Sequence, residues 1–311
     1  MPKRPGPTGL CSGASRPPER CPGKLHVMKP GAARNPAQGQ AVTREMQAWV
    51  AAQLAGGHST EEIFGALTEA GWKAAAAKQA LGLPAAGAAS LPALAVPVVT
   101  LDATGTMVDA GDKWVEVREH RDAPDLWVFS NLLSAAECTA LMDAAAPRLA
   151  RSRTVDTLTG GEELNHDRTS HGMFYTRGET AIVSRVEARI ARLLNWPVQN
   201  GEGLQVLRYR RGAEYKPHYD YFDPGEPGTA KILQRGGQRV GSLIMYLQEP
   251  EEGGATVFPD IGLKVRPQRG SAVFFSYPRA HPVSLTLHGG EPVRAGEKWI
   301  ATKWLREKEF T

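Results

Sequence analysis

The chain has 311 residues, of which 41% are hydrophobic, so it can form one large domain or two smaller ones, and disorder throughout is excluded. Its net charge of +4 is concentrated at the start, because residues 1–40 hold seven Lys or Arg and one acid, which leaves −2 for the rest. A domain that neutralises phosphates needs a clustered basic surface, so we expect no nucleic-acid partner.

Cysteine use and hydropathy indicate a cytoplasmic protein. The three cysteines, Cys11, Cys21 and Cys138, provide neither a disulfide framework nor the spacing of zinc ligands. There is no run of eighteen apolar residues, and the basic N-terminus continues into Pro and Gly rather than an apolar segment. We therefore expect no membrane span and no signal peptide.

The first forty residues contain eight prolines and six glycines, with few large apolar side chains. Such a segment cannot bury enough surface to offset chain entropy, so we expect residues 1–40 to be a disordered basic tail.

Residues 41–83 are expected to form a small helical module. Apolar side chains recur at helical spacing from Met46 to Leu54, and Gly56-Gly57 ends that run. Ser59-Thr60-Glu61-Glu62 has the pattern of a capping box that opens a second helix, and a third helix is expected from Trp72 to Leu81.

Residues 84–112 are predicted to be a linker, because the segment begins with an Ala-, Pro- and Val-rich stretch that has no period. The main domain, in which the candidate catalytic residues below lie, is expected to span residues 113–311. It should begin with strands at 114–117 and 126–129, followed by a helix capped by Ser134 and another over 179–194.

After Gly203 the chain becomes mostly β, with short segments rich in β-formers and separated by turn residues. These segments follow two helices, so we predict an α+β protein whose core, at about 203–307, is a double-stranded β-helix of the jelly-roll type buttressed by helices. This architecture places ligands inside the mouth of a barrel. The expected strands are 204–209, 215–221, 240–248, 255–258, 263–266, 272–276 and 299–305.

His218 and Asp220 lie two residues apart on a predicted strand, so their side chains point to the same face and can bind one ion together. His288, from a distant segment, can supply a second imidazole. Two histidines and one carboxylate form the triad of non-haem Fe(II) oxygenases, which leaves open positions on the metal. His281 competes with His288 for this role, and we prefer His288 because it stands ten residues before Lys298.

Lys298 lies at the start of a strand whose neighbours, Trp299 and Ile300, indicate burial. A buried ammonium needs a partner, and the distal carboxylate of a co-substrate would supply one. An ordinary surface lysine is the alternative.

A series of short motifs with characteristic spacing runs through the second half of the chain. In order, they are Arg208-Tyr209, Gly212, Tyr215, His218-Tyr219-Asp220, Gly253–Phe258, Lys264-Val265, Gly270–Val273, His288–Val293, Gly296–Trp299 and Lys303-Trp304. In these residue types and in their spacing, the sequence from about Asp125 to Glu307 resembles the prolyl 4-hydroxylase α-subunit family of 2-oxoglutarate/Fe(II) dioxygenases.

The resemblance implies that His218, Asp220 and His288 hold Fe(II), and that Lys298 and Tyr209 hold 2-oxoglutarate. Tyr209 has an equally plausible role as a core aromatic residue. Thr302 shares the strand face of Lys298, so it is a further candidate for the same group, although strand propensity explains it as well.

Two residues are assigned to substrate binding from the same resemblance. Trp304 matches a family tryptophan near the site, with core packing as the alternative. Arg168 lies in a segment that resembles the family's cover of the peptide-binding groove, and it would hold a peptide carbonyl or an internal acid. Residues 41–83 resemble modules that precede the oxygenase domain in some bacterial members, and we expect a packing appendage or the contact of a homodimer.

The implied function is hydroxylation of a peptidyl proline at C4, with 2-oxoglutarate converted to succinate and CO2 and with ascorbate rescuing the iron. The expected partner is a peptide or protein that contains proline. One alternative is a related dioxygenase that acts on another residue or on a free amino acid. A second alternative is a non-catalytic peptide-binding scaffold. A third is a nucleic-acid-modifying dioxygenase, and the charge balance of the folded body disfavours this one.

Overall fold

The structure is a computed structural model that describes residues 42, 44–72, 74–81, 93–155, 162–164 and 169–311. The predicted tail, 1–40, lies outside these residues. Within the described ranges no helix is both long and apolar enough to cross a membrane.

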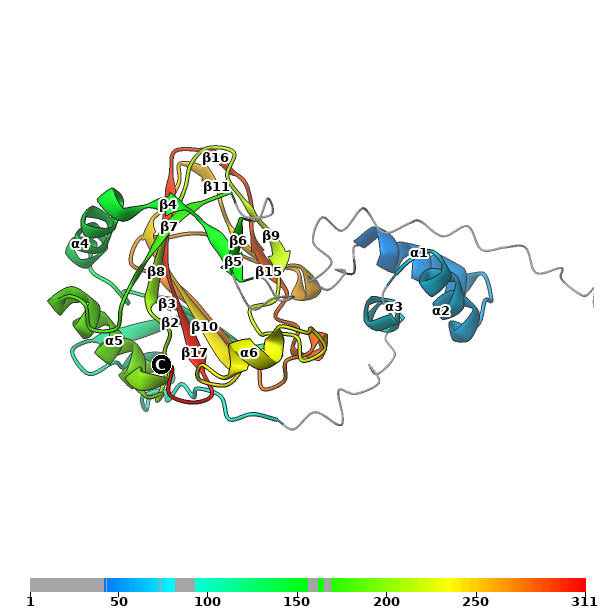
Figure 1. Ribbon diagram of the computed structural model, residues 1–311, viewed down its shortest axis with the longest axis horizontal. Helices are drawn as coiled ribbons and strands as arrows, with labels where there is room; N and C mark the ends of the chain where they lie inside the picture. Colours follow the sequence, from blue (N-terminus) through cyan, green and yellow to red (C-terminus); the bar gives the residue numbers. More distant parts are fainter. Residues whose placement is uncertain (1–41, 43, 73, 82–92, 156–161, 165–168) are drawn as a thin grey trace, which may run out of the picture.

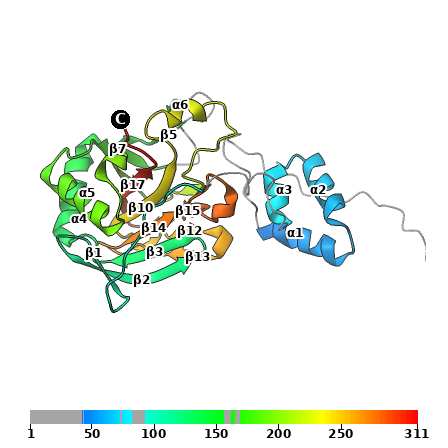
Figure 2. The ribbon, with the colours of Figure 1, turned by 90° about the horizontal axis from the view of Figure 1, so that it is seen from below.

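Three short helices form a group with its own apolar core (Figure 2). The predicted capping box is confirmed, because the Ser59 side chain accepts from the backbone N–H of Glu62 and the Glu62 carboxylate accepts from the Ser59 backbone N–H. Met46, Ile63 and Leu67 are fully buried between the helices. The helices are α1 (Arg44–Ala55), α2 (Thr60–Glu69) and α3 (Ala74–Ala80).

The larger sheet has nine strands in the order β1-β2-β3-β14-β10-β17-β8-β7-β4, and every pairing in it is antiparallel. Its strands are β1 (Met107–Asp109), β2 (Trp114–Asp122), β3 (Asp125–Ser130), β4 (Ala150–Arg151), β7 (His171–Tyr175), β8 (Leu204–Tyr209), β10 (Arg239–Gln248), β14 (Ala272–Ser276) and β17 (Lys298–Arg306).

A smaller antiparallel sheet has the order β13-β12-β15-β9. Along the chain, β8, β10, β14 and β17 of the large sheet alternate with β9, the β12–β13 pair and β15 of the smaller one. This alternation is the double-stranded β-helix that the sequence predicts. The strands of the smaller sheet are β9 (Tyr215–His218), β12 (Thr256–Phe258), β13 (Leu263–Val265) and β15 (His288–Gly290).

Every residue of β17 is buried, because both faces of the large sheet are covered. Trp299 and Leu305 on one face join the apolar core under the helices. Ile300 on the other face joins the core between the two sheets. The period-two alternation of a strand therefore sends alternate side chains of β17 into the space between the sheets.

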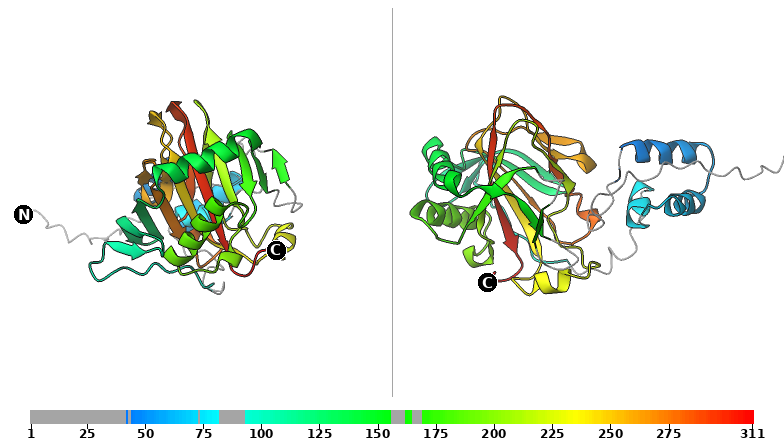
Figure 3. Two further views of the ribbon diagram at one scale, coloured as in Figure 1. Left: turned by 90° about the vertical axis from the view of Figure 1, so that its left-hand side faces the viewer. Right: turned by 45° about the horizontal axis from the view of Figure 1, so that its top comes forward.

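Two helices, α4 (Ala135–Ala145) and α5 (Ala181–Leu193), lie across the outer face of the large sheet (Figure 3, left). The predicted Ser134 cap is confirmed as a capping box with Glu137. The remaining elements are η1 (Ala146–Arg148), β5 (Arg153–Val155), β6 (Glu162–Leu164), η2 (Val198–Asn200), α6 (Thr229–Leu233), β11 (Glu252–Gly253), η3 (Pro259–Ile261), η4 (Pro282–Ser284) and β16 (Val293–Ala295).

The segment predicted as a linker, 84–112, differs from expectation over its described part. Leu94, Val96 and Val99 pack against the main core, and the Leu94 N–H donates to the carbonyl of Pro278 at 2.8 Å. Strand β1 also lies in this segment. The described part of 84–112 therefore packs with the main domain, because Val and Leu side chains without a regular period still bury apolar surface against its core.

Candidate metal centre and co-substrate pocket

Three predicted ligands converge where β9 and β15 meet. His218 ends β9, His288 begins β15, and the two are direct partners in the register. Asp220 lies just beyond β9 rather than on it, so the strand predicted over 215–221 ends early. All three side chains are buried, and one ligand atom from each lies within 4.8 Å of the other two.

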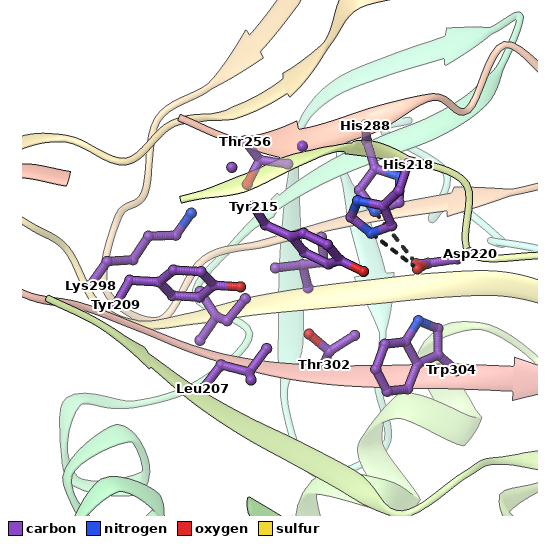
Figure 4. Close-up of a pocket in the computed structure, with 14 residues that line it drawn as sticks. Leu207, Tyr209, Tyr215, His218, Asp220, Thr256, His288, Lys298, Thr302 and Trp304 are labelled. Carbon is purple, nitrogen blue, oxygen red and sulfur yellow. Dashed lines mark ion pairs between the residues drawn. The ribbon is translucent and has the colours of Figure 1, made fainter. Parts of the chain in front are cut away.

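Hydrogen bonds orient both imidazoles toward Asp220. Nδ1 of His218 donates to the carbonyl of Lys216 at 2.9 Å, and Nδ1 of His288 donates to the carbonyl of Thr286 at 3.0 Å. Because a carbonyl only accepts, each Nδ1 carries the proton and each Nε2 is free to ligate. Both Nε2 atoms lie 3.5 Å from the Asp220 carboxylate (Figure 4).

Electrostatics favour the ligating forms of His288 and Asp220. Burial lowers the pKa of His288 to about 4, so its imidazole is neutral at neutral pH. Burial alone raises the pKa of Asp220, but His288, His218 and Arg239 together hold it below its ordinary value. Two imidazoles and one carboxylate, oriented at one point, fit a divalent metal of the Fe(II) type.

His281, the competitor for the second imidazole, lies outside the cluster. It precedes the short helix η4, and its Nδ1 accepts from the backbone N–H of Val283 at 3.1 Å. The structure therefore places His288, and not His281, beside His218 and Asp220.

Other side chains hold the ligands in place. The hydroxyl of Ser242 donates to Oδ2 of Asp220 at 2.6 Å and lies 2.9 Å from the hydroxyl of Tyr277. The ring of His288 packs against Phe258 and Phe275, with centroids 5.9 and 4.6 Å away. Such contacts restrict how metal ligands turn.

The triad forms one end of a pocket between the two sheets (Figure 4). The empty space, which includes open solvent at the mouth, is about 420 Å³. It is lined by Leu207, Tyr209, Tyr215, His218, Asp220, Ile244, Thr256, His288, Gly289, Gly290, Lys298, Ile300, Thr302 and Trp304.

Lys298 lies at the other end of the pocket, and 3% of its surface is exposed. Its ammonium donates to the carbonyl of Gly254 at 2.6 Å and lies 5.6 Å from the Tyr209 ring centroid and 5.8 Å from that of Tyr246. Within the described ranges no carboxylate forms an ion pair with it, and burial lowers its pKa to about 7. A buried ammonium without a counter-ion suits an anionic ligand.

The other predicted residues are placed as follows. Tyr209 pairs with Lys298 across β8 and β17, and its hydroxyl points into the pocket (Figure 4). Thr302 and Trp304 lie on the pocket face of β17, with Thr302 between Lys298 and the triad and Trp304 beside the triad. Arg168 lies outside the described residues.

Sequence reasoning missed Tyr215 as a pocket residue. Its ring stacks on His218, with centroids 3.7 Å apart and planes at 24°. Strict alternation places these two residues on opposite faces, but a register irregularity between β9 and β15 brings them together. Pro217 within the strand was the available signal, since proline in a strand marks bulges.

Sequence reasoning also missed Thr256 and the glycines of β15. Thr256 accepts a hydrogen bond from the Tyr246 hydroxyl at 2.7 Å and lines the pocket near Lys298. A Cβ on Gly289 would lie 2.9 Å from the carbonyl oxygen of Tyr215, so the close approach of β15 to β9 requires glycine there.

Comparison with known proteins gives a consistent result. The sequence model of the 2OG-Fe(II) oxygenase superfamily matches residues 204–306. Probable prolyl 4-hydroxylase 3 of Arabidopsis thaliana is 40% identical over 221 residues, covering 64% of this chain and 75% of that protein. Prolyl 4-hydroxylase 5 of the same plant is 39% identical over 221 residues, covering 64% and 74%.

Among solved structures, the viral collagen prolyl hydroxylase of Paramecium Bursaria Chlorella virus-1, in its 2OG complex, is 31% identical, with a TM-score of 0.45. That alignment covers 58% of this chain and 95% of the viral protein.

The double-stranded β-helix and the buried cluster of two histidines and one carboxylate define a non-haem iron oxygenase. The chain belongs to the prolyl 4-hydroxylase family, within the 2OG-Fe(II) oxygenase superfamily. This membership implies Fe(II) as the metal and 2-oxoglutarate as the co-substrate.

Proposed function

We propose that the protein hydroxylates a peptidyl proline in an Fe(II)- and 2-oxoglutarate-dependent reaction that forms succinate and CO2. The observation that carries the proposal is a single pocket with the His218–Asp220–His288 cluster at one end and the buried ammonium of Lys298 at the other. The Arabidopsis relatives named prolyl 4-hydroxylases support proline as the target.

In this proposal the two Nε2 atoms and the Asp220 carboxylate hold Fe(II). When bound together, iron and 2-oxoglutarate supply the oxidation that places one atom of O2 in a substrate C–H bond and the other in succinate. The protein holds the ligand side chains in fixed positions. The Nδ1–H donors of both histidines are held by backbone carbonyls and Asp220 is held by Ser242, so the ligands are oriented before the metal arrives.

Lys298 is proposed to pair with the C5 carboxylate of 2-oxoglutarate. The Tyr209 hydroxyl would add a hydrogen bond to the same carboxylate, and the Thr302 hydroxyl lies on the same wall, closer to the metal cluster. A buried, charge-assisted pair of this kind fixes both position and orientation. It also restores the charged form of Lys298, whose pKa burial has lowered.

Apolar side chains line the pocket between its two ends. Leu207, Ile244 and Ile300 supply aliphatic surface, and Trp304 stands beside the metal cluster. Phe174, which is 47% exposed, approaches Trp304 with ring centroids 6.3 Å apart. These two rings form an aromatic wall that leads outward, where we propose that the peptide binds.

Several further assignments remain predictions. Ascorbate is proposed as the reductant that restores iron oxidised during turnovers without a peptide. Arg168 is proposed to contact the peptide. A cytoplasmic location is carried from the sequence, as is a role for the helices of residues 41–83 as a packing appendage or homodimer contact.

The first test is succinate formation by purified protein with Fe(II), 2-oxoglutarate and a panel of proline-containing peptides. The proposal predicts that at least one peptide stimulates succinate formation, and that the same peptide with alanine in place of proline does not. Equal stimulation by the alanine peptides would reject proline as the target. No succinate with any peptide would reject the proposed function.

A further inference from the structure

Arg239, at the start of β10, lies behind the wall of the pocket. Its Nε and Nη2 donate to the two carboxylate oxygens of Glu202 at 2.6 and 2.9 Å, in a bidentate pair. Both residues are 8% exposed. A planar guanidinium held at two points is fixed in orientation as well as in position.

The guanidinium stacks on the indole of Trp304, with its central carbon 4.1 Å from the ring centroid. Phe222 covers the same guanidinium at 4.7 Å. Glu202 also holds the main chain of Trp304, because its backbone N–H donates to the Trp304 carbonyl at 3.0 Å. The pair therefore contacts both the backbone and the ring of Trp304.

The remaining nitrogen of the guanidinium contacts one of the metal-ligand residues, since Nη1 donates to the backbone carbonyl of Asp220 at 3.3 Å. One buried group thus contacts a metal ligand and a residue that lines the pocket. The indole Nε1–H of Trp304 is buried and has no hydrogen-bond partner within the described ranges. A donor in this state is available to an acceptor on a bound molecule.

We propose that Arg239 and Glu202 form a positioning pair that fixes the Trp304 indole relative to Asp220, and that this keeps the oxidation directed at the bound peptide. The inference rests on the proposed function. Neither residue lines the pocket, so both act through Trp304 and Asp220. When the pair is broken, 2-oxoglutarate is still consumed, with ascorbate supplying the two electrons that the peptide C–H bond would otherwise give, but fewer turnovers end in a hydroxylated peptide.

The chain offers a matched control on β17, the strand that carries Trp304. Lys303, next to Trp304, forms a buried ion pair with Glu187 at 2.5 Å, and both side chains are 2% exposed. Neither residue lines the pocket. Lys303→Gln and Arg239→Gln each remove the cation of a buried pair, so both are expected to destabilise the fold. Only Arg239→Gln removes the stack on Trp304.

The first measurement needs no activity. The near-UV circular dichroism of each protein is compared with that of the same protein carrying Trp304→Phe, so the difference reports how rigidly Trp304 is held. We expect most of the difference to be lost in Arg239→Gln and also in Arg239→Lys, because an ammonium has no planar surface. The difference should persist in Lys303→Gln. Equal retention in the Arg239 and Lys303 variants would overturn the proposal.

The second measurement is the ratio of succinate to hydroxyproline formed with saturating peptide. The ratio is expected to rise roughly tenfold or more in the Arg239 variants, because small misplacements at a reacting centre cost that much. It should stay at the wild-type value in Lys303→Gln. With Trp304→Phe already present, Arg239→Gln should change the ratio much less than it does alone.

The outcomes separate this inference from the proposed function. Wild-type protein without any succinate rejects the function, and the dichroism comparison still decides the positioning role. An active wild type with an unchanged ratio in the Arg239 variants rejects the positioning role alone. A wild-type ratio of succinate to hydroxyproline in Arg239→Lys also rejects the positioning role, because a positive charge without a planar group would then be enough to keep the ratio low.

Discussion

His218 and His288 are direct partners in the register of β9 and β15, and their rings lie 4.4 Å apart between centroids. The convergence of the metal ligands therefore depends on how closely these two strands approach each other. Gly289 permits that approach, since a Cβ there would lie 2.9 Å from the Tyr215 oxygen and 3.0 Å from the Pro217 nitrogen. Both contacts are with backbone, which has little freedom to move.

Gly289→Ala is expected to push β15 away from β9 and to weaken metal binding by roughly tenfold to a hundredfold, as displaced ligand shells do. Titration with Fe(II) without oxygen measures the change. Gly65→Ala is the control, because a Cβ there meets nothing within 4 Å. Equal metal affinity in the Gly289 and Gly65 variants would contradict the role given to the strand approach.

Ser242→Ala is expected to weaken metal binding by about tenfold, because it removes the hydroxyl that holds Asp220. Ser276→Ala is a matched control on the neighbouring strand, where the hydroxyl donates to Asp125 at 2.8 Å, away from the cluster. Its metal affinity should equal that of the wild type. The same loss in both variants would mean that general destabilisation, and not the orientation of Asp220, causes the effect.

The two candidate imidazoles give opposite predictions. His288→Ala should abolish Fe(II) binding, because it removes one of three converging ligands. His281→Ala should leave binding close to the wild-type value, since that side chain only accepts a bond from the Val283 backbone. Metal content after dialysis distinguishes them. Retained iron in the His288 variant with loss in the His281 variant would reverse the assignment.

Lys298 gives 2-oxoglutarate binding a defined pH dependence. Burial lowers its pKa to about 7, so free protein loses the ammonium above that pH, while a bound carboxylate requires it. The affinity for 2-oxoglutarate should be constant below pH 7 and fall by about tenfold per pH unit above it. The fall should stop at the pKa that Lys298 has in the complex. Calorimetry with saturating Mn(II), in two buffers of different ionisation enthalpy, should detect close to one proton taken up per ligand at about pH 8.5.

Lys298→Arg is the control for this pH dependence, because guanidinium stays charged throughout the range. Its affinity for 2-oxoglutarate is expected to be lower but nearly independent of pH. A wild-type affinity that does not change between about pH 6 and pH 9 would contradict the lowered pKa of Lys298 in the free protein.

The same group affects stability without ligand. The pKa of Lys298 is lower in the folded chain than in the unfolded chain, so the unfolded chain binds more protons between about pH 7 and 10.5. The free energy of unfolding should therefore rise with pH across this window, by at most about 1.4 kcal/mol per unit from this residue. Urea unfolding of wild type and Lys298→Met isolates the contribution, since the methionine variant lacks it.

Much of the site was predictable, because its chemistry depends on residue type and spacing. His218, Asp220, His288 and Lys298 converge on one pocket as expected, and Ser59 and Ser134 cap their helices. Those features are local or follow the period of a strand.

Features that depend on packing between distant segments were not predictable. The Glu202–Arg239 pair joins residues 37 apart, and nothing in either local sequence indicates the contact. Strand β15 was missed because His-Gly-Gly has low strand propensity, and pairing with β9 and β12 overrides that preference. Residues near Leu94 have no period, but they pack on the core.

The most direct test of the central claim is mass spectrometry of a proline-containing peptide after incubation with the protein, Fe(II), 2-oxoglutarate and O2. We predict the addition of one oxygen atom on proline with wild type and none with Asp220→Ala, which lacks one of the metal ligands. Hydroxylation that persists in Asp220→Ala, or an oxygen atom found only on other residues, would contradict the account.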